Sequence, residues 1–106
     1  MINVEEIIEW HKTTFPDATE NEQKIKFLEE YREYLESHDI NELADMCIVN
    51  VALNDRYNCA MFDSIVGREI NEFGNDELLL QAITHKMDIN KQRKWHKVEG
   101  IYRHRC

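Results

Sequence analysis

The segment that most restricts the fold runs from Leu43 to Leu53, where nearly every position around a helix is apolar. It follows Asp39-Ile40-Asn41-Glu42, which has the form of a helix start, with an Asp cap and a Glu three residues later. A helix that is apolar on almost every side has to be buried. The sequence therefore predicts a central helix over about residues 40–57.

Four more helices are expected around this one, from apolar residues spaced three and four apart. Pro16 ends the first helix, and Thr19 with Glu22 forms a capping box for the second. Gly74 ends the fourth and Asn75 caps the fifth. The predicted ranges are about 3–14, 20–37, 61–73 and 75–95. Residues 96–106 show no periodicity and are expected to form a C-terminal tail.

The composition also favours helices. The 106 residues include three Gly and one Pro, fewer turn residues than an all-β domain needs. We expect a single all-α domain over residues 1–106, with a four-helix core and one additional short helix. A domain of this size buries a thin core, so we also expect it to oligomerise.

Charge is unevenly distributed along the chain. The net charge is −8 overall, −9 over residues 1–50 and +5 over residues 86–106. An acidic body disfavours general binding to nucleic-acid phosphates, whereas the basic end can hold a small anion. Nucleic acid is therefore not an expected partner.

The cysteines and the N-terminal residues indicate a cytoplasmic protein. Three cysteines without a CxxC spacing fit a reducing compartment. The acidic opening MINVEEIIEW has no signal-peptide layout, and no apolar run is long enough to span a membrane.

Four carboxylates are expected to converge near the turn between the second and third helices. The short connection over residues 37–39 makes these helices antiparallel neighbours. Glu30 and Asp45 lie equally far from the turn, as do Glu33 and Glu42. Each pair within a helix is three residues apart and shares a face. Like charges this close are costly unless a cation such as Mg²⁺ binds them.

An ordinary structural explanation competes with this metal site. Glu42 occupies the N3 position of a capping box, and Asp45 suits the positive end of the helix dipole. Glu29 and Glu36 have no partner by the same symmetry and are expected to face solvent.

Lys86, Asn90 and Arg93 share one face of the fifth helix, at spacings of four and seven. Lys and Arg beside an Asn are groups that bind phosphate oxygens. The alternative is a solvated last turn, where cations suit the helix dipole. Trp95 can stack on a nucleobase or can close the helix as a hydrophobic lid.

Taken together, these motifs resemble those of the MazG-like, all-α nucleoside triphosphate pyrophosphohydrolases. The resemblance covers most of residues 9–97, and the gap between Glu33 and Glu42 is shorter than usual in the broader family. The ending is similar to that of the dATP/dGTP diphosphohydrolase branch. The matching stretches are E-E-x-x-E (29–33), E-x-x-D (42–45), ADMCIV, EWHKTTFPDAT and KMDINKQRKW.

The resemblance implies a Mg²⁺ site, with Mn²⁺ as a possible substitute. Its ligands would be Glu30, Glu33, Glu42 and Asp45, and Glu30 or Glu33 would also orient or deprotonate the attacking water. The triphosphate would face Lys86, Asn90 and Arg93, with Trp95 as a candidate for the base.

The expected function is hydrolysis of a nucleoside triphosphate to the monophosphate and pyrophosphate, and the branch resemblance implies a purine dNTP, dGTP or dATP, as the substrate. The resemblance also implies a homodimer or homotetramer, and a role in the host cytoplasm if a phage encodes the chain. Two alternatives stay open. The same fold can act on pyrimidine dNTPs or alarmones, or the chain can be a non-catalytic helical module that oligomerises.

Overall fold

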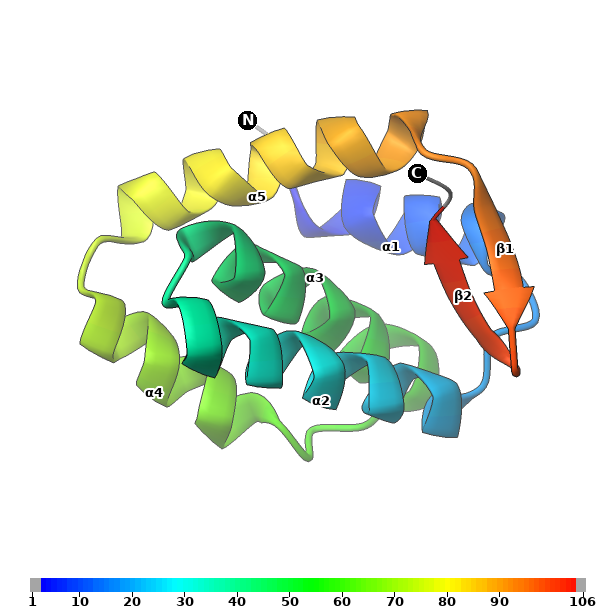
Figure 1. Cartoon of the computed structure of the whole chain (residues 1–106), viewed down its shortest axis with the longest axis horizontal. Helices are drawn as coiled ribbons and strands as arrows, with labels where there is room; N and C mark the ends of the chain where they lie inside the picture. Colours follow the sequence, from blue (N-terminus) through cyan, green and yellow to red (C-terminus); the bar gives the residue numbers. More distant parts are fainter. Residues whose placement is uncertain (1–2, 105–106) are drawn as a thin grey trace.

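The computed structural model describes residues 3–104; Met1, Ile2, Arg105 and Cys106 lie outside the described residues. Five helices are followed by a two-stranded hairpin (Figure 1). The helices are α1 (Val4–Thr14), α2 (Glu20–Ser37), α3 (Ile40–Tyr57), α4 (Asp63–Phe73) and α5 (Asp76–Gln92); the strands are β1 (Trp95–Val98) and β2 (Ile101–His104).

The central position predicted for α3 is confirmed. It packs against α1, α2, α4 and α5, and Figure 1 shows it in the middle of the bundle. Burial from all these sides explains why apolar residues surround this helix. Its buried residues are Leu43, Ala44, Met46, Cys47, Ile48, Val49, Ala52 and Leu53.

Two apolar clusters meet at α3. In the larger cluster, Phe27 of α2 stacks on Phe62 with ring centroids 4.2 Å apart. The smaller cluster joins Ile7 of α1, Ile48 of α3 and Met87 of α5. α3 therefore holds the other helices in fixed positions around it.

Several predicted helix ends agree with the structure, but the capping box expected over Asp39–Glu42 is not formed: the Asp39 side chain accepts from the Asn41 N–H, and the Asp39 N–H donates to Ser37 Oγ. Thr19 and Glu22 form the expected capping box, and the Asn75 side chain accepts from the Leu78 N–H at 3.0 Å. Gly74 ends α4 at φ +76°, a conformation that glycine adopts without strain. α4 begins at Asp63, two residues after the predicted start near residue 61.

The prediction for the C-terminal part of the chain was wrong. α5 ends at Gln92 instead of near Trp95, and Arg93 is already extended at φ −75° and ψ 150°. Within the described part of the expected tail, β1 and β2 pair antiparallel, with Val98 opposite Ile101. Glu99 and Gly100 form the tight turn with φ of +53° and +82°, as a two-residue type I′ turn requires.

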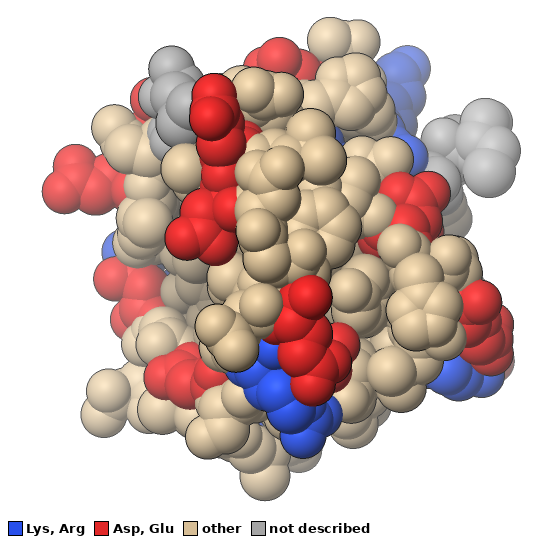
Figure 2. Space-filling view, turned by 90° about the vertical axis from the view of Figure 1, so that its left-hand side faces the viewer, with Lys and Arg blue, Asp and Glu red and all other residues tan. Residues whose placement is uncertain are grey.

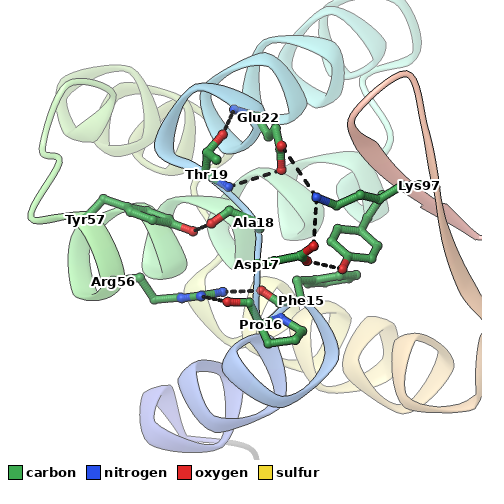
Figure 3. Close-up of polar contacts among 10 residues, drawn as sticks. Phe15, Pro16, Asp17, Ala18, Thr19, Glu22, Arg56, Tyr57 and Lys97 are labelled. Carbon is green, nitrogen blue, oxygen red and sulfur yellow. Dashed lines mark hydrogen bonds and ion pairs between the residues drawn. The ribbon is translucent and has the colours of Figure 1, made fainter.

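The connection between α1 and α2 is fixed by residues from distant segments (Figure 3). Arg56 of α3 donates to the carbonyl oxygens of Phe15 and Pro16 at 2.7 and 3.2 Å. The Lys97 ammonium lies 3.1 Å from Asp17 and 3.7 Å from Glu22. The hairpin is thereby attached to the start of α2.

The surface reflects the acidic composition. Figure 2 shows the end of the molecule near the α4–α5 connection, where acidic side chains are scattered and basic ones appear in only a few places. Among the described residues, no helix combines the length and the apolar character needed to cross a membrane.

Candidate functional site

A cavity of about 400 Å³ opens between the helices and the hairpin. Its walls include side chains from α1, α2, α3, α5, β1 and β2. All eight residues that the sequence singled out line it: Glu30, Glu33, Glu42, Asp45, Lys86, Asn90, Arg93 and Trp95. The structure thus brings the two predicted groups to one place.

Three glutamates form the acidic end of the cavity. Carboxylate oxygens of Glu30, Glu33 and Glu42 lie within 4.8 Å of one another. The antiparallel pairing of α2 and α3 places Glu42 opposite Glu33, as the distances from the turn predicted. Glu30 is 6% exposed, whereas Glu33 is exposed and Glu42 half-buried, so the cluster has a buried side and an open side.

Asp45 lies beside this cluster and is paired with a cation. The Lys86 ammonium is 3.2 Å from Asp45 Oδ2, and Lys26 is 3.1 Å from Glu30 Oε1. Lys26 precedes Glu30 by four residues on α2, a spacing that favours an ion pair. The acidic end therefore contains two lysines that offset part of its charge.

Two carboxyl groups at the acidic end have pKa values well above their ordinary range. Burial, a hydrogen bond with Glu33 and the nearby carboxylates raise the pKa of Glu42 to about 8. Burial and Glu30 raise the pKa of Asp45 to about 7, and Lys86 opposes this rise. The pKa of both carboxyls is raised chiefly because burial disfavours their ionised form, and the neighbouring carboxylates add to this effect.

The donor set fits a hard divalent cation. Three carboxylates that can each supply an oxygen, without His or Cys among them, match the preference of Mg²⁺ or Mn²⁺. A cation would displace the protons from Glu42 and Asp45 and relieve the repulsion. Asp45 can join this set or continue to pair with Lys86.

The predicted phosphate-binding residues differ in their surroundings. Asn90 is 5% exposed, and its amide lies 4.0 Å from the Met87 sulfur. Arg93 follows the last turn of α5, and its guanidinium forms no ion pair with the described residues. Trp95 is on β1, where its indole N–H donates to the Asn90 carbonyl at 3.2 Å. Arg93 is therefore the cation at this wall that is available to an anionic ligand.

The expectation for Glu29 was wrong, whereas that for Glu36 agrees with the structure. Arg103 of the hairpin donates to both Glu29 oxygens, at 2.9 and 2.8 Å. This pairing lowers the pKa of Glu29. Glu36 is exposed, with Arg32 at 4.0 Å as a weak surface partner.

Several cavity residues were missed by the sequence analysis. Lys26 could have been found from the sequence, because it precedes Glu30 by four residues on the same helix. Tyr102 and Arg103 were missed because residues 96–106 were expected to be a tail. His11 and Gln23 were missed because they approach one another only when α1 folds against α2.

His11 was assigned no role from the sequence, and the structure buries it at 2% exposure. Its Nε2 lies 3.0 Å from Gln23 Oε1, and its Nδ1 lies 3.0 Å from the Arg56 guanidinium. Burial lowers the pKa of His11 to about 4, and the Arg56 charge adds to this effect. The imidazole is neutral at physiological pH.

Aromatic rings complete the wall near His11. Phe15 lies against Trp10, Trp95 and Tyr102, with centroid separations of 5.2, 5.1 and 4.6 Å. The cavity thus has an acidic end formed by α2 and α3 and an aromatic end formed by α1 and the hairpin.

No protein-family model, curated protein or solved structure matches this chain.

Proposed function

We propose that this chain is a Mg²⁺-dependent nucleoside triphosphate pyrophosphohydrolase and that its substrate is a purine deoxynucleoside triphosphate. The observation that carries the proposal is the cluster of Glu30, Glu33 and Glu42 in one cavity with Arg93 and an aromatic wall. A metal-binding group, a phosphate-binding group and a surface for a planar base are the three parts that such a substrate requires.

The carboxylates have distinct tasks in this proposal. Glu30, Glu33 and Glu42 would hold the cation, and Asp45 would either join them or position Lys86. Bound Mg²⁺ would supply charge neutralisation and a more acidic bound water. Glu33 is exposed at the open side, so it is best placed to orient the attacking water and accept its proton; Glu30 is the alternative.

The bond changes follow from the expected products. The water oxygen bonds to the α-phosphorus as the bond from that phosphorus to the α–β bridging oxygen breaks. Pyrophosphate leaves and the monophosphate remains. Arg93 offsets the charge of the leaving group, and Lys86 can contact the phosphates while it keeps Asp45, since an ammonium has three donors.

Self-association belongs to the same proposal. Ile25, Leu28 and Leu35 of α2 are 45%, 50% and 48% exposed, and their spacing places them on one side of the helix. We expect a homodimer or homotetramer that covers this stripe. Sedimentation of the wild type and of Leu28→Glu tests this; a wild-type monomer at all micromolar concentrations would contradict it.

A panel of purine dNTPs, pyrimidine dNTPs and alarmones, assayed with and without Mg²⁺, tests the activity. We expect pyrophosphate from a purine dNTP, and only with the metal. Free phosphate from an undamaged purine dNTP would show that the bond is wrongly assigned. A faster reaction with pyrimidine or alarmone substrates would favour the second specificity, and no turnover of any nucleotide would favour a non-catalytic helical module.

A further inference from the structure

Three hydrogen-bonded side chains from three helices lie at the aromatic end of the cavity, and two of them, His11 and Gln23, line it. Arg56 of α3 contacts His11 of α1, and His11 contacts Gln23 of α2. Gln23 is 6% exposed and lines the cavity. These three side chains lie apart from the acidic cluster and take no part in the proposed hydrolysis.

Arg56 determines the direction of both hydrogen bonds among these three side chains. A guanidinium carries only N–H donors, so His11 Nδ1 has to accept from it. The neutral ring then carries its proton on Nε2 and donates to Gln23 Oε1. The guanidinium itself is held by the Phe15 and Pro16 carbonyls (Figure 3).

Gln23 is consequently fixed in one of its two amide orientations. If the amide were turned over, its NH₂ group would face the His11 Nε2–H, and two donors would meet in a buried place. In the observed orientation, the amide nitrogen of Gln23 donates to none of the described residues. Because Gln23 lines the cavity and its amide nitrogen is not one of the fully buried unpaired atoms, this donor is accessible to a ligand that supplies an acceptor.

The position of Gln23 suits the base of the proposed substrate. It precedes Glu30 by seven residues, so the two side chains share a face of α2 and are about 10 Å apart along the axis. This separation is comparable with the length of a nucleoside. The rings of Trp10, Phe15, Trp95 and Tyr102 lie at the same end of the cavity.

We infer that Gln23 is a specificity-determining residue that donates from its amide nitrogen to the 6-keto oxygen of guanine. This inference rests on the proposed function, because it assumes that the cavity accepts a purine nucleotide. Guanine presents an acceptor at position 6, whereas adenine presents an amino group. Since Arg56 and His11 prevent the amide from turning over, the protein discriminates against adenine.

Base analogues test the inference on the unmodified protein. We expect kcat/KM for dGTP to exceed that for dATP by about 10–100-fold, as for one well-placed base contact. dITP keeps the 6-keto group and lacks the 2-amino group, so it should behave like dGTP. If dITP were discriminated against as strongly as dATP, the inference would be overturned.

Gln23→Leu should reduce the dGTP/dATP ratio to about one, mainly through the KM for dGTP, while kcat stays similar. Gln81→Leu makes the same change at an exposed position of α5 and should leave the ratio unchanged. A purely structural role of Gln23 would instead lower the activity on both nucleotides equally.

Two measurements do not depend on turnover. Nitrogen-15 NMR should find His11 neutral, with its proton on Nε2; a proton on Nδ1 would overturn the inference.

Calorimetry should find dGMP bound more tightly than dAMP. That binding preference without any pyrophosphate release would contradict the proposed function alone, whereas turnover with equal binding of both nucleotides would contradict the base contact alone. Failure to bind either nucleotide would contradict both.

Discussion

The two ends of the cavity satisfy their buried polar groups in different ways. At the aromatic end, His11 has a partner on each ring nitrogen, and Arg56 is held by backbone carbonyls. At the acidic end, three glutamates face one another, and among them Glu30 is paired with Lys26, while Lys86 pairs with the neighbouring Asp45.

The aromatic end is arranged to position side chains, whereas the acidic end is arranged to bind a ligand. At the aromatic end, hydrogen bonds hold His11 and Arg56 without a ligand and leave the Gln23 amide nitrogen available to one; such a network adds stability and fixes side-chain directions. A group of like charges lowers stability until a ligand of opposite charge arrives, and such conflicts are typical of functional sites. Changes at the acidic end should therefore mainly lower activity, whereas changes at the aromatic end should mainly lower stability.

The largest expected effect is on activity at the acidic end. Glu30→Gln removes the most buried charge of the cluster, so Mg²⁺-dependent pyrophosphate release should fall by about 10³-fold, because metal-based charge stabilisation is lost. Steady-state assays of pyrophosphate release measure this. Glu36→Gln, the same change at an exposed position of α2, should keep wild-type activity; full activity in Glu30→Gln would contradict the site.

The next effect is on stability at the aromatic end. His11→Leu leaves Gln23 and Arg56 without their buried partner and should reduce the free energy of unfolding by about 2–4 kcal/mol. Urea denaturation measures this loss. His85→Leu, at an exposed position of α5, is the matched control and should change stability by less than about 0.5 kcal/mol. Equal effects of both changes would show that the His11 network contributes little.

Mg²⁺ should stabilise the wild type by relieving the repulsion at the acidic end. At a concentration 100 times the dissociation constant, a cation that binds the folded state adds about 2.7 kcal/mol. For a chain of this size the melting temperature should then rise by roughly 10 °C. KCl at equal ionic strength is the control, and an equal rise with KCl would indicate screening instead of a site.

The smallest effect concerns pH. The folded pKa of Glu42, about 8, lies above its ordinary value of 4.5, so the folded state keeps a proton that the unfolded state loses. Without metal, stability from this group is present below about pH 4.5 and is lost as the pH rises to 8. Because Glu42 is only half-buried, solvent screens much of this effect, and Glu42→Gln should stabilise the metal-free protein by only about 1 kcal/mol at pH 8 and hardly at all near pH 5.

His11 provides the opposite comparison in the same titration. Its folded pKa of about 4 lies below the ordinary 6.5, so the unfolded state binds the extra proton. The stability from this group is present above pH 6.5 and is lost as the pH falls towards 4. Urea denaturation at several pH values measures both slopes; a gain for Glu42→Gln that did not depend on pH would contradict the raised pKa.

The sequence predicted much of the helical architecture and the acidic cluster. Helix ends depend on local signals, and residues such as Thr19, Gly74 and Asn75 supply them. The convergence of Glu33 and Glu42 follows from a short turn between neighbouring helices, which is also a local feature.

The sequence patterns could not predict the hairpin or the hydrogen bonds of His11, and the cause differs between the two. Glu99 adopts a positive φ that is more typical of Asn or Asp, so the turn lacked its usual Asn-Gly or Asp-Gly sequence. Arg56 and His11 are 45 residues apart, and their contact depends on the packing of α1 against α3. Single residues at such distances carry no spacing that a pattern can detect.

The attachment of the hairpin has a consequence for ionic strength. Its ties to α2 and the preceding connection include ion pairs at partly exposed side chains, from Lys97 to Asp17 and Glu22 and from Arg103 to Glu29. Salt weakens such pairs, whereas the contact between Phe15 and Tyr102 is apolar and is not screened. One wall of the cavity is therefore held partly by salt-sensitive contacts, while the opposite wall belongs to the apolar core around α3.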